Sequence, residues 1–288
     1  MPALELSAGT VEYEDTGGGG PVMVMLHGLL MDSSQWRHLI ADLRADYRCV
    51  APTLPLGGHR RPMRADADLS LPAQVRLVGE FLEGLDLSDV TLIGIDTGGG
   101  LAQIVVAERP ERIARMVLVS PETFDNYPPG LPGHAAWLAG QLPGGMAAAL
   151  QPLRLRALRR LPMSFGWMSK RPVPDEVMDS WLRPVLTQRE IRRDVRKYVR
   201  GARRDSHFLR AASERMAEFD RPVLVVWARE DRVMPPEHGR RLAELLPQGR
   251  LAEIGDSYTL VTEDQPVELA WRVRQFLRDT ERVGAEPR

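Results

Sequence analysis

The chain has 288 residues, and its 38 lysines and arginines against 39 aspartates and glutamates give a formal net charge of −1 at pH 7. A composition of 43% hydrophobic and 27% charged residues excludes both a disordered chain and a membrane-embedded one. The balanced charge gives no indication of a nucleic-acid partner. The single cysteine, Cys49, cannot form an intrachain disulfide.

The N-terminal segment, MPALELSAGTVEY, has neither the basic start nor the apolar stretch of a secretory signal peptide. The most apolar longer stretch, residues 135–150, is interrupted by polar residues, proline and glycine, and is shorter than the ~20 residues that span a bilayer. We therefore expect a cytoplasmic protein that does not enter a membrane. No set of residues has metal-ligand or phosphate-binding spacing, so we expect no metal and no cofactor.

Short runs rich in Val, Ile and Leu, each ending in Gly, Pro or a small polar residue, predict buried strands. These runs are residues 22–27, 48–52, 90–95, 116–120, 223–228 and 251–254. Segments with helical periodicity lie between most of them, at residues 74–85, 101–107, 239–246 and 267–277. Strands that alternate with helices indicate an α/β fold, with a mostly parallel central sheet flanked by helices.

One interval interrupts this alternation. About a hundred residues separate the strand that ends at Ser120 from the strand that begins at Val223, and they are rich in helix formers with frequent Pro and Gly. This composition predicts a helical insertion after the strand that ends at Ser120. We expect residues 123–217 to form a helical cap, or lid, on a core made of residues 1–122 and 218–288.

The predicted cap is strongly basic. Residues 151–215 contain seventeen Lys and Arg against seven Asp and Glu. In the helix expected over residues 188–204, the apolar residues form one stripe and the basic residues lie mostly off it. The stripe consists of Ile191, Val195, Tyr198, Val199 and Ala202. The basic face is either a solvated helix surface or a positive field that attracts an anionic substrate.

The segment with the most chemical information is VTLIGIDTGGG, residues 90–100. A buried strand leads into Gly94-Ile95-Asp96-Thr97-Gly98, and a helix follows. This is the G-x-nucleophile-x-G pattern of a strand-to-helix turn, with aspartate where serine is more common. The turn is so tight that side chains at its flanking positions would collide. Asp96 is therefore either an exposed nucleophile or an aspartate that caps the helix.

Three further features occur in the order expected for one family. The strand at residues 22–27 ends in His27-Gly28-Leu29, and the strand at residues 223–228 runs into a loop with Asp231. The helical insertion lies between the predicted strands at residues 116–120 and 223–228. Together with the strand-to-helix turn at Asp96, these features resemble the α/β-hydrolase fold superfamily, in the branch with an aspartate nucleophile that includes epoxide hydrolases and haloalkane dehalogenases. The resemblance implies that the helical cap is inserted after the sixth strand.

The resemblance implies a site and a mechanism. Asp96 would attack an electrophilic carbon to form an ester, and a histidine would then activate water to hydrolyse it. Asp231 would be the acid that partners this histidine. The backbone N–H groups of Leu29 and Thr97 would form the oxyanion hole.

The histidine is missing at its expected place. In the family it follows the last strand and precedes a helix that begins at a Gln-Pro or similar pair. Aligning Gln265-Pro266 with that pattern puts Thr259 in the position of the histidine. Threonine cannot accept a proton at neutral pH. None of the six histidines falls at the expected position; they are His27, His38, His59, His134, His207 and His238.

Three functions follow from this absence. One is hydrolysis of the substrate, with Asp231, Asp256 or a relocated histidine orienting water. The alternatives are a cyclase or isomerase in small-molecule biosynthesis, with Asp96 as a base, and a small-ligand-binding protein without turnover. The leading hypothesis is an epoxide-hydrolase-like enzyme whose water-activating step is altered.

The residues around Asp96 bear on the substrate. Haloalkane dehalogenases generally carry tryptophan after the nucleophile as a halide donor, whereas this chain has Thr97, which favours the epoxide hydrolase branch. In epoxide hydrolases, cap tyrosines hydrogen-bond the epoxide oxygen, and here Tyr127 and Tyr198 are the candidates, with ordinary core packing as the alternative. Thr259 and Trp36 complete the candidate substrate contacts, and packing is also the alternative for Trp36. We expect a small-molecule substrate and leave monomer and dimer open.

Overall fold

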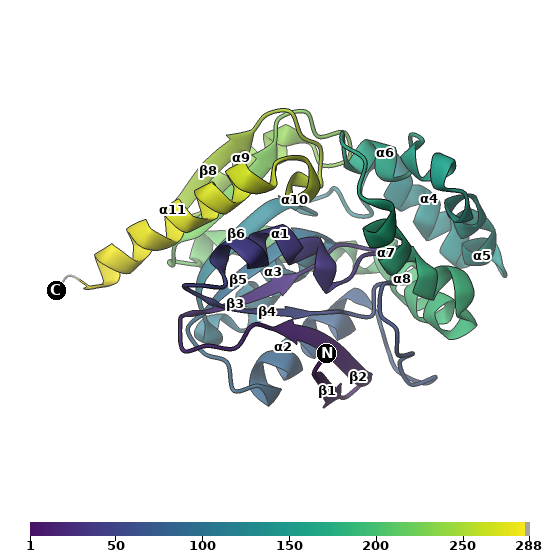
Figure 1. Cartoon of the computed structure of the whole chain (residues 1–288), viewed down its shortest axis with the longest axis horizontal. Coiled ribbons are helices and arrows are strands. Elements are labelled where there is room, and N and C mark those ends of the chain that lie inside the picture. The colour runs from purple at the N-terminus through teal and green to yellow at the C-terminus, as the bar shows by residue number, and fades with distance from the viewer. Residues whose placement is uncertain (286–288) are drawn as a thin grey trace.

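The computed structural model describes residues 1–285 of the chain, which form an eight-stranded sheet flanked by helices (Figure 1). The strand order is β1-β2-β4-β3-β5-β6-β7-β8. Strands β3 to β8 are parallel to one another, and β1 and β2 add two antiparallel strands at one edge. The bounds are β1 Ala3–Leu6, β2 Gly9–Asp15, β3 Val22–Leu26, β4 Arg48–Pro52, β5 Val90–Asp96, β6 Ile113–Pro121, β7 Val223–Ala228 and β8 Gly249–Ile254.

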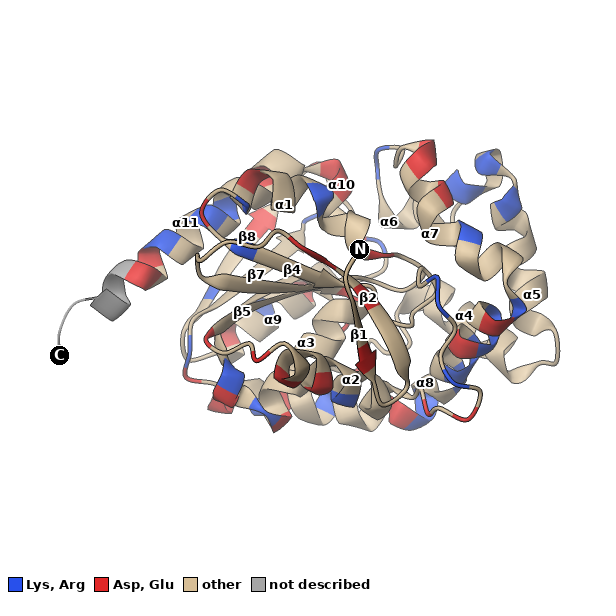
Figure 2. Cartoon of the chain, turned by 60° about the horizontal axis from the view of Figure 1, so that its bottom comes forward, with Lys and Arg blue, Asp and Glu red and all other residues tan. Residues whose placement is uncertain are grey.

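Helices cover both faces of the sheet, with α1 and α11 packed together on one face and α2, α3 and α9 on the other (Figure 2). This double cover explains why β5 is buried along its whole length and largely apolar, since both of its faces pack against helices. The helices of these layers are α1 Arg37–Leu43, α2 Leu71–Gly84, α3 Thr97–Glu108, α9 Pro236–Leu245, α10 Val261–Asp264 and α11 Pro266–Ala285. No helix within residues 1–285 has the length and apolarity needed to cross a bilayer.

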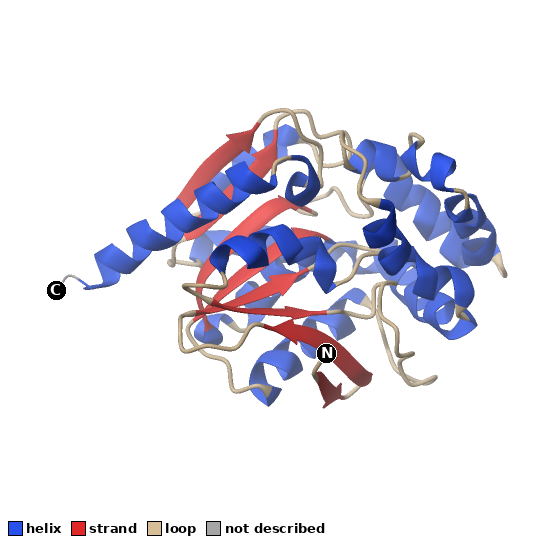
Figure 3. Ribbon diagram, viewed as in Figure 1, coloured by secondary structure: helices blue, strands red, loops and turns tan. Residues whose placement is uncertain are grey.

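The expected α/β architecture is confirmed, and all six predicted strands are present. Strands β1 and β2 were missed because a half-buried edge strand alternates polar with apolar residues and contains no continuous apolar run. Figure 3 shows these two strands at one edge of the sheet, away from the helices between β6 and β7.

The long interval between β6 and β7 is helical, and we call it the α4–α8 segment (Figure 1). Its helices are α4 Gly130–Gln141, α5 Gly145–Leu150, α6 Phe165–Met168, α7 Asp175–Thr187 and α8 Arg189–Arg215. The predicted apolar stripe of α8 is buried at all five positions, from Ile191 to Ala202, and the helix continues about ten residues beyond the predicted end. Helix α8 packs on α2 and α3, so it joins this segment to the sheet.

Candidate active site

The turn between β5 and α3 places Asp96 in a conformation that few side chains adopt. Asp96 has φ 52° and ψ −126°, outside the regions that non-glycine residues normally occupy. A side chain on Gly94 would collide with the Gly98 carbonyl, and one on Gly98 would collide with the carbonyl of Leu26. The two flanking glycines therefore permit the turn that presents Asp96 beyond the end of the sheet.

The Asp96 carboxylate lies beside the two backbone N–H groups that the family resemblance implies for the oxyanion hole. The N–H of Leu29 donates to Asp96 Oδ2 at 3.2 Å, and the N–H of Thr97 is a second donor to the same carboxylate. A Cβ on Gly28 would lie 2.5 Å from Oδ2, so only glycine lets the Leu29 loop approach this closely. One carboxylate oxygen is thus held by the backbone.

Burial raises the pKa of Asp96 to about 7. The N–H groups of Leu29 and Thr97 oppose this rise because they stabilise the carboxylate, and the nearby charge of Asp231 adds to it. Only 4% of Asp96 is exposed. Near neutral pH the group therefore exchanges between its protonated and ionised forms, which suits acid–base as well as nucleophilic chemistry.

A second carboxyl group, Glu122, lies beside Asp96 and was missed by the sequence analysis. It directly follows β6, the neighbour of β5, and it is 2% exposed. The Thr97 hydroxyl donates to Glu122 Oε1 at 3.0 Å, whereas Oε2 has no partner within the described residues. Burial, and then the Asp96 charge, raise the pKa of Glu122 well above its usual range. Its position at the carboxyl end of a predicted strand was the available signal.

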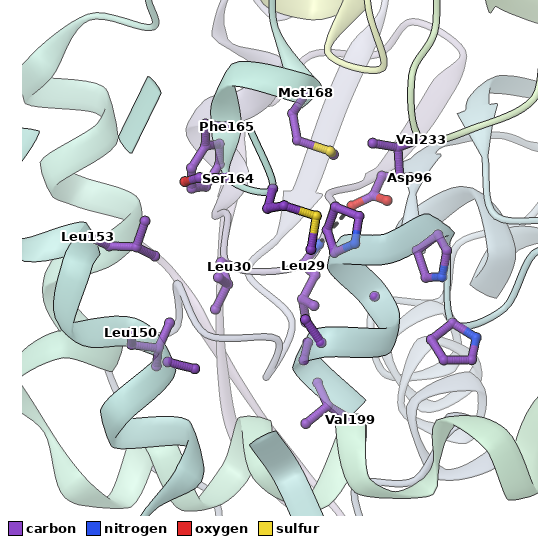
Figure 4. A pocket seen from close by; sticks show the side chains of 18 of the residues that line it. Leu29, Leu30, Asp96, Leu150, Leu153, Ser164, Phe165, Met168, Val199 and Val233 are labelled. Carbon is purple, nitrogen blue, oxygen red and sulfur yellow. Dashed lines mark hydrogen bonds between the residues drawn. The ribbon is translucent and has the colours of Figure 1, made fainter. Parts of the chain in front are cut away.

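A cavity of about 380 Å³ lies between the ends of β3 and β5 and the α4–α8 segment (Figure 4). Its wall is largely leucine, methionine, proline, alanine and valine, as Leu29, Leu30 and Leu150 illustrate in the figure. Five lining residues carry polar side chains, and no lysine, arginine, histidine or tryptophan lines it. The polar residues are Asp96, Glu122, Tyr127, Ser164 and Tyr198.

Both tyrosines that the sequence singles out line this cavity with Asp96. Tyr127 lies between β6 and α4, and Tyr198 lies on α8. Both are at most 5% exposed. Their two hydroxyls lie near each other, since each affects the pKa of the other, and neither has a well-formed hydrogen bond to any further group within the described residues. Burial raises the pKa of each phenol well above its usual range, so both remain protonated hydrogen-bond donors.

Asp231 and Thr259 contact each other, away from the cavity wall. The Thr259 hydroxyl donates to Asp231 Oδ1 at 2.8 Å, and the same oxygen accepts the N–H groups of Val233 and Met234. Asp231 Oδ2 has no partner within residues 1–285, and burial raises the pKa of Asp231 to about 6. Thr259 thus bonds to the acid that a histidine partners in the resembled family, but it supplies no proton acceptor for water.

Three residues that the sequence analysis considered for the site do not line the cavity. Thr259 is fully buried, and its hydroxyl bonds to Asp231. Trp36 is also fully buried and packs in the core rather than against the cavity. Asp256, considered as a residue that orients water, is at the surface, where it pairs with Lys170 and Arg171.

The six histidines do not replace the missing base, because none of them lines the cavity. His27 Nε2 accepts the N–H of Leu54, which gives this histidine a structural role at the loop. His59 is on a loop that the sequence analysis places near the site. Its Nε2 lies 3.3 Å from Oδ2 of Asp194 on α8. The histidines of the chain thus leave Asp96 without an imidazole at the cavity.

Most basic residues of the α4–α8 segment are exposed or partly exposed, although Arg159 is buried, and none of them lines the cavity. Several form ion pairs within the segment, such as Arg156 with Asp175 and Arg159 with Asp179. Since no cationic side chain reaches the cavity, the interpretation that this face is solvated fits better than attraction of an anionic substrate into the site.

Comparison with known proteins places the chain in a family. The family model described as alpha/beta hydrolase fold matches residues 21–266. The cis-3-alkyl-4-alkyloxetan-2-one decarboxylase of Shewanella oneidensis is 24% identical over 295 residues, which cover 98% of this chain and 90% of that protein.

Two similar proteins are haloalkane dehalogenases. That of Mesorhizobium japonicum is 36% identical over 104 residues, 36% of this chain and 33% of that protein. The crystal structure of the enzyme from Bradyrhizobium elkani superposes with a TM-score of 0.80 at 20% identity, covering 97% of each chain. The chain therefore belongs to the α/β-hydrolase-fold family.

Proposed function

We propose that the protein opens the ring of a small, neutral, largely apolar epoxide through Asp96. The observation that carries this proposal is the arrangement of one cavity. It holds a carboxylate whose Oδ2 accepts the N–H of Leu29 and which has the N–H of Thr97 as a second donor, together with two neighbouring tyrosine hydroxyls that have no well-formed bond to any other protein group. A nucleophile and free donors in one apolar cavity suit a reaction in which a carbon is attacked while its oxygen takes on negative charge.

In the first step, the free oxygen of the Asp96 carboxylate attacks an epoxide carbon, and the bond from that carbon to the ring oxygen breaks. Tyr127 and Tyr198 hydrogen-bond the ring oxygen as its charge develops. The product is a hydroxyalkyl ester on Asp96. Water then attacks the ester carbonyl, and the N–H groups of Leu29 and Thr97 stabilise the oxyanion until the diol leaves.

The names of the similar proteins support an electrophilic carbon as the target. One is named for a decarboxylase acting on an oxetan-2-one, a strained oxygen heterocycle, and others are named haloalkane dehalogenases. No tryptophan lines this cavity, and Thr97 follows the nucleophile, so a halide would lack an indole donor. The two neighbouring phenols suit an oxygen leaving group better.

The second step lacks the histidine of the resembled enzymes. We therefore expect the ester on Asp96 to be hydrolysed slowly. Thr259 already bonds to Asp231 and cannot take a proton from water. We expect ester hydrolysis, rather than ring opening, to limit turnover.

A second candidate, a non-hydrolytic cyclase or isomerase, is favoured by one observation. The pKa of Asp96 lies at about 7, where a carboxylate removes protons from carbon or oxygen more effectively than an ordinary aspartate does. In that case Asp96 would act as a base and no ester would form.

A single-turnover experiment in H₂¹⁸O distinguishes these functions. If Asp96 is the nucleophile, water attacks the ester carbonyl, and the heavy oxygen is found in the peptide that contains Asp96. If Asp96 only activates water, the heavy oxygen is found in the diol and not in the peptide. Absence of diol and of any Asp96 adduct across a broad panel of epoxides would refute the proposal. A ligand returned unchanged, with affinity retained in Asp96→Ala, would indicate a binding protein.

The variant Thr259→His tests the second step. Because residue 259 contacts Asp231, a histidine there would have its acid partner in place. We expect faster loss of the Asp96 ester in this variant than in the natural protein. The matched control is Thr259→Val, which removes the hydroxyl without adding a base and should not hasten ester loss.

A further inference from the structure

Glu122 is a buried titratable residue of the cavity. Ring opening by Asp96, as proposed above, gives it no role. Its backbone N–H donates to the Asp96 carbonyl at 3.1 Å, and its own carbonyl accepts from Gln103 Nε2 at 2.8 Å. The Thr97 hydroxyl fixes Oε1. Every polar atom of Glu122 except Oε2 is therefore held, either by the turn at Asp96 and Thr97 or by Gln103 of α3.

The remaining oxygen, Oε2, is buried without a partner in a residue that lines the cavity. A buried polar atom without a hydrogen bond destabilises the fold, so a purely structural role does not explain a carboxyl at this position. Gly100 packs on the Glu122 side chain, and a Cβ there would lie 3.3 Å from the Glu122 Cβ and 3.4 Å from Oε2. Asp231, by comparison, does not line the cavity.

We propose that Glu122 is the proton carrier of the reaction: it gives a proton to the opened epoxide oxygen and later takes one from the water that hydrolyses the Asp96 ester. The inference rests on the proposed function, since it assigns the proton transfers of that reaction. Glu122 thereby does from the β6 side what a histidine does in the resembled enzymes.

The protons balance over the cycle. In ring opening, the Asp96 carboxylate forms a C–O bond, the ring C–O bond breaks, and the ring oxygen takes the proton of the Glu122 carboxylic acid. Glu122 is now a carboxylate. It accepts a proton from water as the water oxygen attacks the ester carbonyl, and the acyl C–O bond to the alkyl group then breaks. The departing alkyl oxygen takes that proton from Glu122, which completes the diol. Asp96 is now a carboxylic acid, and it loses its own proton to Glu122. The cycle closes with the diol, the Asp96 carboxylate and the Glu122 acid.

The electrostatics of the pair support this order. In the free enzyme, burial and the charge of Asp96 hold the proton on Glu122. Esterification removes the Asp96 charge, so the repulsion between the two carboxylates disappears at the step in which Glu122 must ionise. When hydrolysis restores the Asp96 carboxylate, the repulsion returns and Glu122 is protonated again.

The test isolates the second step by forming the ester with a primary iodoalkane, because loss of iodide requires no proton donor. The full-length protein and Glu122→Gln are alkylated, freed of excess reagent and followed by intact mass and by mass spectrometry of the Asp96 peptide. The glutamine keeps an oxygen to accept from Thr97 but cannot carry a proton. Glu14→Gln is the matched control, because burial also raises the pKa of Glu14, which lies on β2 outside the cavity.

We expect both variants to be alkylated on Asp96, and the ester of Glu122→Gln to persist ~100-fold longer than that of the natural protein. The rate of ester loss should rise with pH in the natural protein as Glu122 ionises, and be flat in Glu122→Gln. Glu14→Gln should behave as the natural protein. Equal rates of ester loss with and without Glu122 would overturn the inference and leave the proposed function intact. Failure of the natural protein to be alkylated by either epoxide or iodoalkane would overturn both.

Discussion

Replacing Asp96 by asparagine should make the folded protein more stable, and the gain should grow with pH. Burial raises the pKa of this carboxyl to about 7 from an ordinary value of 3.8. The folded state therefore binds its proton more tightly than the unfolded state does. Stability from such a group is fully present below the unfolded pKa and is lost as the pH rises through the folded pKa.

The magnitude follows from this difference of about three pH units, at about 1.4 kcal/mol per unit. The raised pKa lowers the free energy of unfolding by about 4 kcal/mol at pH 8, where the buried group is ionised, and by about 1.5 kcal/mol at pH 5, where it stays protonated while the unfolded chain would ionise. Asparagine is neutral at both pH values, and its side-chain oxygen can still accept the N–H of Leu29. The free energy of unfolding of Asp96→Asn should therefore exceed that of the natural protein by a larger margin at pH 8.

Urea denaturation followed by tryptophan fluorescence at the two pH values measures this margin. Asp194→Asn is the control of opposite sign, because hydrogen bonds from His59 and the Met63 N–H hold the pKa of Asp194 below its usual range. Its stabilisation is present above the unfolded pKa and lost at lower pH, so this variant should be destabilised at both pH values tested. A gain for Asp96→Asn that is equal at pH 5 and pH 8, or absent, would refute the argument from burial.

Three further predictions concern single side chains. Tyr198→Phe should slow alkylation of Asp96 by an epoxide by roughly 100-fold, because a donor to the ring oxygen is lost. Alkylation by an iodoalkane should be unchanged, and equal slowing of both reactions would contradict the role of the phenol. Gly28→Ala should abolish alkylation of Asp96 by either reagent, since the new methyl group would lie 2.5 Å from Oδ2; an alkylated variant would disprove this steric argument. Cys49 is fully buried and burial raises its pKa to about 12, so iodoacetamide at pH 8 should modify it only after unfolding, as mass spectrometry would show.

The sequence by itself determined the features that depend on residues close to one another along the chain. Apolar runs bounded by turn residues predicted the parallel strands, and the glycines around Asp96 predicted a tight turn, because both are local consequences of chain geometry. The replacement of the histidine by Thr259 could also be predicted, because it depends only on the number of residues between position 259 and Gln265-Pro266.

Only the tertiary structure decided what the cavity contains. Glu122 lies beside Asp96 because β5 and β6 are neighbours in the sheet, and Tyr198 lines the same cavity because α8 packs on α2 and α3. Thr259 and Trp36 are excluded from the cavity by the same packing. These outcomes depend on strand order and on the contacts between helices distant in the chain, which periodicity and spacing along a single sequence do not contain.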